Sequence, residues 1–151
     1  LQTWNMYGCM HEAFADVLGA LVAGVETVGP RSLTEAPSYD SDKLTPYLNK
    51  TQADNDWNFT DFEHAHGIVL ARVIWAVRSK GGLDDGTVVR WMLSALTNLA
   101  GVVNATPSLD YTTVFTALRD TAPDADAGQL LCTELKTAYG TTFALPAACG
   151  A

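Results

Sequence analysis

The chain has 151 residues, and its 9 lysines and arginines against 17 aspartates and glutamates give a net charge of −8. Because 48% of the residues are apolar and only 17% are charged, we expect one folded domain (1–151) with a substantial core. The acidic balance argues against nucleic acid or anionic lipid as a partner, and no apolar run reaches the roughly 20 residues of a membrane span.

The first predicted element is an apolar helix from about Met10 to Val25. Its apolar residues recur at spacings of three and four, and alanine and glycine fill most other positions. A helix that is apolar on nearly every side is expected to lie at the centre of a fold. The following stretch, from Glu26 to Glu63, contains three prolines and eight of the 17 carboxylates, and predicts a long acidic loop.

Four further helices are predicted along the rest of the chain. We expect them over about 61–80, 84–99, 110–118 and 126–139, with a turn over 104–107 and no strand. Asp110 is expected to cap the fourth helix of the chain, and Asp126 to start the fifth. The sequence therefore predicts an all-α fold, a compact bundle of about five helices with a long acidic loop.

Three Asn-x-Thr sequons occur in the chain, where chance would give about one. They lie at Asn49, Asn58 and Asn104. The excess predicts a secreted, extracellular glycoprotein. Because the first residue is Leu1 rather than methionine, we also expect that an upstream segment has been removed.

The cysteine count is odd, which is compatible with secretion but leaves one thiol over. Cys132 and Cys149 could close a short loop that pins the C-terminal tail. Cys9 would then be buried in a helix or bonded to another chain.

Two carboxylates lie one helical turn apart near the start of the chain. Glu12 and Asp16 are four residues apart, so both project from one face of an otherwise apolar helix. Because burying two carboxylates is costly unless a cation meets them, this face could belong to a metal site. The alternative is an ordinary helix N-terminus, where the helix dipole favours acidic side chains. His11-Glu12 does not open an HExxH zinc motif, because the fifth position is Ala15.

A second polar cluster, His64-Ala65-His66-Gly67, lies near the start of the helix predicted over 61–80. Residues two apart on a helix point about 200° away from one another, so the two histidines should not share a metal there. One histidine facing inward could donate a hydrogen bond to developing negative charge. A histidine that only caps the helix is the alternative.

Together these two segments resemble the zinc metallopeptidases of the gluzincin clan, which are thermolysin-like enzymes, and especially the fungalysins. The clan pattern Gly-x-x-x-Glu-x-x-x-Asp is matched by Gly8, Glu12 and Asp16. The fungalysin pattern His-x-x-Gly-x-x-x-Ala-x-x-x-Leu/Trp is matched by His64, Gly67, Ala71 and Trp75. Later segments are also similar, at Phe115–Asp120 and from Cys132 to Gly140, so the resemblance spans nearly the whole chain.

The resemblance implies the fold of the C-terminal helical lobe of such an enzyme. Glu12 would be a zinc ligand, Asp16 would orient a ligand histidine, and His64 would stabilise the oxyanion during peptide hydrolysis. The chain has no HExxH helix, so zinc would bind only if a partner chain supplied two histidine ligands. We therefore expect the chain alone to be inactive, and to pair with an N-terminal peptidase lobe or with itself.

Two other predictions remain open. The chain could be a non-catalytic secreted glycoprotein, derived from a peptidase lobe, that acts by lectin-like or immunomodulatory surface recognition. Separately, Asp54 to Asn58 copies the first ligand spacings of an EF-hand, but Phe59 and Ala65 replace its glycine and its terminal glutamate. Calcium could bind there in another geometry, or the segment could be a solvated acidic loop.

Overall fold

The computed structural model describes residues 3–28, 31–37, 59–105, 110–140 and 143–150. The fold is mostly helical, as the sequence predicts. Its elements are α1 (Thr3–Ala23), β1 (Thr27–Val28), β2 (Arg31–Ser32), α3 (Phe59–Gly81), α4 (Asp85–Ala105), α5 (Tyr111–Asp120), α6 (Ala125–Tyr139) and the 3-10 turn η1 (Ala147–Cys149). No helix in this part of the chain has the length and apolar character needed to cross a membrane.

Several predicted boundaries are corrected by the structure. α1 begins before Met10, and it ends at a glycine turn in which Gly24 has a φ of 65°. α4 extends to Ala105, so Asn104 lies in a helix and not in the predicted turn. α6 begins at Ala125, one residue before the predicted start at Asp126, and it is capped by Asp124, whose side chain accepts a hydrogen bond from the backbone N–H of Ala127.

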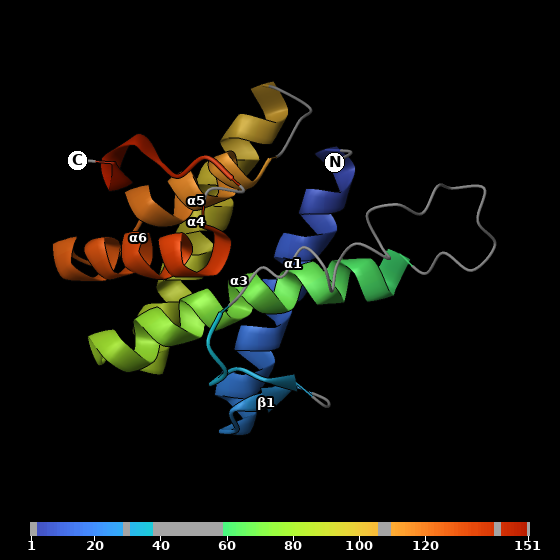
Figure 1. The fold of residues 1–151 in the computed structure, drawn as a ribbon, viewed down its shortest axis with the longest axis vertical. Coiled ribbons are helices and arrows are strands. Elements are labelled where there is room, and N and C mark those ends of the chain that lie inside the picture. Colours follow the sequence, from blue (N-terminus) through green and yellow to red (C-terminus); the bar gives the residue numbers. More distant parts are fainter. Residues whose placement is uncertain (1–2, 29–30, 38–58, 106–109, 141–142, 151) are drawn as a thin grey trace.

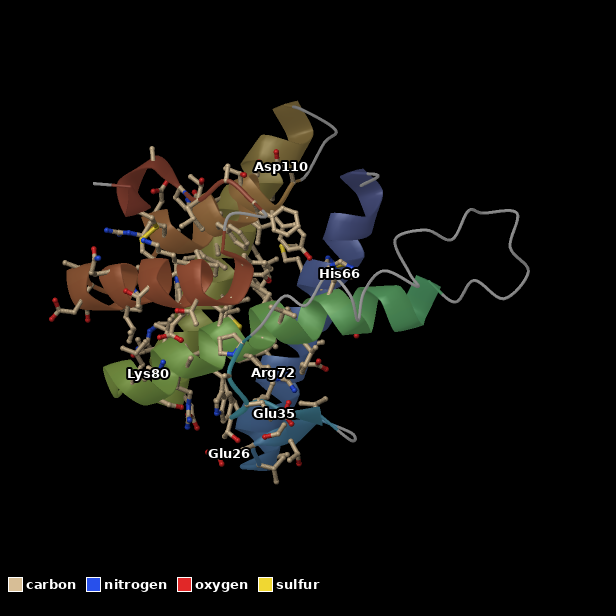
Figure 2. All side chains as sticks on the ribbon, in the orientation of Figure 1. Glu26, Glu35, His66, Arg72, Lys80 and Asp110 are labelled. Carbon is tan, nitrogen blue, oxygen red and sulfur yellow. A yellow bond between two sulfur atoms is a disulfide. The ribbon has the colours of Figure 1, made fainter. Side chains whose placement is uncertain are left out.

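The prediction of no strand is wrong, because a short antiparallel hairpin follows α1. β1 pairs with β2, and the next residue, Leu33, is buried. Arg72 of α3 ties this hairpin to the bundle (Figure 2): its Nε donates to the carbonyl oxygen of Ser32, and its guanidinium pairs with Glu35. The rest of the predicted acidic loop, including the candidate calcium segment over 54–58, lies mostly outside the described residues.

The helices form two groups that meet along α3 (Figure 1). α1 packs mainly against α3, whereas α3 also contacts α6, and α5 contacts both α4 and α6. Inside the second group, the indole Nε1 of Trp91 donates to the carbonyl oxygen of Leu118 at 2.8 Å. A disulfide between Cys132 and Cys149, the pair that the sequence suggests, joins α6 to η1.

α1 is less central than its composition predicts. One face is buried, including Ala13, Val17 and Ala20, but Ala15, Gly19 and Ala23 are exposed. The side chain of Val22 is 89% exposed. The apolar character of α1 therefore exceeds what its packing against α3 requires, and leaves an apolar outer face in contact with solvent.

Candidate functional site

The two motif segments meet where α1 contacts α3. A Cβ atom added to Gly67 would lie 2.8 Å from the carbonyl oxygen of Cys9 and 2.9 Å from the Cβ of Glu12. Only a residue without a side chain allows the two helices to approach so closely. Gly67 therefore brings the carboxylate helix and the histidine helix, more than 50 residues apart in sequence, into direct contact.

The two carboxylates lie within α1 and not at its start. Glu12 and Asp16 follow the first residue of α1 by nine and 13 positions, and no acidic residue occurs in the first turn. The helix-dipole explanation for these acids is therefore wrong, because the dipole acts within the first turn. Asp16 is only 6% exposed and Glu12 is half-buried beside Gly67, whereas His11 is exposed.

The inward-facing histidine of the described cluster is His66, which the sequence did not single out over His64. His66, labelled in Figure 2, is fully buried, and its Nδ1 lies 3.0 Å from the hydroxyl oxygen of Tyr111 in α5. Burial lowers the pKa of His66 from 6.5 to about 4, so the imidazole is neutral at pH 7. It borders a gap too small to hold a water molecule, together with Cys9, Met10, Leu70, Tyr111 and Val114.

No sequence signal separates His66 from His64, because the choice depends on which face of α3 meets α1 and α5. The hydrogen bond to Tyr111 joins residues 45 positions apart. His66 thus links α3 to α5 through its Nδ1, and Cys9 is a buried thiol beside it.

His64 lies in α3, but its side chain is outside the described part of the structure. Its backbone position precedes Gly67 by three residues, and positions three apart share one side of a helix. Position 64 is therefore on the side of α3 that Gly67 presents to α1.

The described residues contain no group of three histidine, cysteine, aspartate or glutamate side chains that could hold a metal ion. A catalytic zinc site requires three protein ligands. Glu12, half-buried at a helix contact, could supply at most one carboxylate ligand, and further ligands would have to come from elsewhere.

The structure does not test the glycosylation predictions. Asn49 and Asn58 fall outside the described residues, and Asn104 lies in α4 with a side chain that is not described.

No protein-family model matches the chain, and no curated protein or solved structure shows significant similarity to it. The resemblance to the gluzincins therefore rests on the motif residues alone.

Proposed function

We propose that this chain is the C-terminal lobe of a secreted zinc metalloendopeptidase and completes a metal site whose other ligands belong to a partner chain. The observation that carries the proposal is the contact at Gly67. If the two motifs were accidental, nothing would require the Glu12 face of α1 to meet the helix that carries His64.

Each motif residue has a defined role in this proposal. Glu12 would be the third zinc ligand, and Asp16, buried one turn further along α1, would accept a hydrogen bond from a ligand histidine and fix its orientation. His64 would donate a hydrogen bond to the negative charge that develops on the peptide carbonyl oxygen. The chemistry that bound zinc supplies in such a site is Lewis-acid activation of water and carbonyl.

Two features of the chain support a secreted lobe that needs a partner. The disulfide between Cys132 and Cys149 is typical of an oxidising compartment. The exposed outer face of α1, with Val22 89% exposed, is an apolar surface that a second polypeptide could cover.

The test is reconstitution with the HExxH-bearing lobe of a fungalysin-type peptidase. We expect the mixture, but not this chain alone, to retain one zinc equivalent and to cleave casein. Glu12→Gln should remove both properties. Glu35→Gln, a matched change at an exposed carboxylate that pairs with Arg72, should leave them unchanged.

A complex that keeps its zinc and its activity in the Glu12→Gln variant would contradict the proposal. So would one equivalent of zinc, with activity, in the isolated chain.

The same apolar face of α1 favours a second candidate, a non-catalytic glycoprotein that acts by surface recognition. In that case the chain would self-associate or bind a partner through α1 without zinc. Binding that is unaffected by a metal chelator and by Glu12→Gln would favour this alternative.

A further inference from the structure

A cavity of about 370 Å³ lies where the C-terminal end of α1 meets α3 and the start of α4. Its charged lining consists of Glu26, Arg78 and Asp85, with Trp75 beside them. Glu26 is labelled in Figure 2 near that end of α1. A volume of this size is within the range of small-molecule pockets. Neither Glu12 nor Asp16 lines this cavity, so it is distinct from the candidate metal site.

The guanidinium of Arg78 is held in one orientation. Its Cζ lies 4.5 Å from the ring centroid of Trp75, which is itself only 3% exposed. Its Nε and Nη2 both donate to Oδ1 of Asp85, at 2.9 and 2.7 Å. Stacking on Trp75 and pairing with Asp85 already fix the side chain of Arg78. Binding of a ligand to this side chain would therefore cost little further conformational entropy.

One edge of this guanidinium remains available to a ligand. A guanidinium carries about five N–H groups, and the bonds to Asp85 use those on one side. No described residue accepts a hydrogen bond from the edge formed by Nη1 and the second N–H of Nη2. Two parallel N–H groups of this kind bind a carboxylate in bidentate fashion.

The rest of the charged lining favours an ammonium group. Within the described part of the chain, no residue donates a hydrogen bond to the carboxylate of Glu26 or to Oδ2 of Asp85. The last turn of α1 contains no basic residue, so the negative end of its dipole is not compensated within the helix. Two carboxylates against one guanidinium leave the lining with a net negative charge.

The exposed lining is mostly polar, and its smaller apolar part includes Leu21 and Val25. Gly24 adds no side chain to fill the cavity. We infer that this cavity binds a free α-amino acid. The ligand carboxylate pairs with the outer edge of Arg78, and its ammonium group lies at Glu26 and Asp85.

L-leucine is the probe, titrated into the whole chain by isothermal calorimetry. N-acetyl-L-leucine lacks the ammonium group, and L-leucinamide lacks the carboxylate. We expect each derivative to bind at least about tenfold more weakly than leucine, because each loses a charge-assisted contact. These comparisons use the unaltered protein, so they decide the proposal even if a variant fails to fold.

Two variants and a control assign the contacts. Arg78→Gln should weaken leucine binding at least about tenfold, and Glu26→Gln about threefold or more. The control is Arg90→Gln, which removes the same charge from an arginine of α4. Arg90 donates a hydrogen bond to Thr87 and does not line the cavity, so this variant should bind leucine as the wild type does. No leucine binding up to about 10 mM, a derivative that binds as tightly as leucine, or an equal loss in Arg90→Gln would each overturn the proposal.

This inference does not depend on the metallopeptidase proposal, because its measurements involve neither zinc nor a partner chain.

Discussion

The helices α4–α6 and the α1–α3 pair use their polar side chains differently. In α4–α6, Asp110 and Asp124 accept hydrogen bonds from backbone N–H groups at the starts of their helices, and Trp91 donates to a backbone carbonyl. The two aspartates are explained by local structure alone, and Trp91 by the contact between α4 and α5. The buried carboxylate of α6, Glu134, is paired with Lys80 of α3 at 2.6 Å. In α1–α3, Asp16 and His66 are buried within helices and cap neither helix end.

This difference indicates where to look for function. A buried carboxylate or imidazole in the middle of a helix gives the helix no local stabilisation, and its desolvation is costly. The hydrogen bond to Tyr111 accounts for His66 as a link between helices, whereas a carboxylate such as Asp16 is expected where a site requires it. The α1–α3 pair is thus the part of the molecule in which stability and function should be in conflict.

The largest expected effect concerns the pH dependence of stability and His66. The pKa of His66 is about 4 in the folded chain and near 6.5 when unfolded, so below pH 6.5 only the unfolded chain takes up the proton. The contribution of His66 to the free energy of unfolding should therefore fall by about 3 kcal/mol between pH 7 and pH 4. Urea unfolding of the wild type and of His66→Asn at pH 7 and pH 4 measures this contribution. Between the two pH values the wild type should lose about 3 kcal/mol more of its free energy of unfolding than the variant loses.

His11→Asn, at an exposed position of α1, is the matched control and should follow the wild-type curve. An imidazole of His66 that titrates near pH 6.5 by NMR would contradict the prediction.

The next effect concerns the helix contact at Gly67. Gly67→Ala forces its Cβ against Cys9 and Glu12, and should lower the free energy of unfolding by about 2 kcal/mol. Gly19→Ala on α1 adds the same methyl group where no atom lies within 4 Å, and should stabilise the chain by about 0.5–1 kcal/mol. Denaturation curves that show equal effects would mean that α1 and α3 are not in close contact.

The smallest effect tests the α4–α6 group. Asp124→Ala removes the cap of α6 and should cost about 1 kcal/mol. Asp126→Ala removes the same charge from the first turn without removing the cap, and should cost less than half as much. If Asp126→Ala were the more damaging change in thermal unfolding, the assignment of the cap would be wrong.

Helical periodicity predicts the helices of this chain because each buries an apolar stripe, as the structure confirms for α3 to α6. The hairpin is not predictable in this way, because its strands are only two residues long and Arg72, 40 positions away in sequence, holds it. For α1 the periodicity does not reveal how much of the helix is covered.

The candidate site is only partly readable from sequence. The spacing of Glu12 and Asp16 places both on one helix, but only the tertiary contact at Gly67 brings them to α3. The burial of His66 depends on Tyr111, which belongs to another helix and carries no motif. The charged cavity at Arg78 likewise combines residues from α1, α3, α4 and the residues that follow α1, and no local pattern predicts it.

The most direct test of the central claim is X-ray diffraction at the zinc absorption edge from the reconstituted complex. The proposal predicts one anomalous peak within about 2.0–2.2 Å of the carboxylate of Glu12, with two histidines of the partner lobe as the other ligands. An anomalous peak remote from Glu12, or a complex that forms without α1 facing the partner lobe, would contradict it.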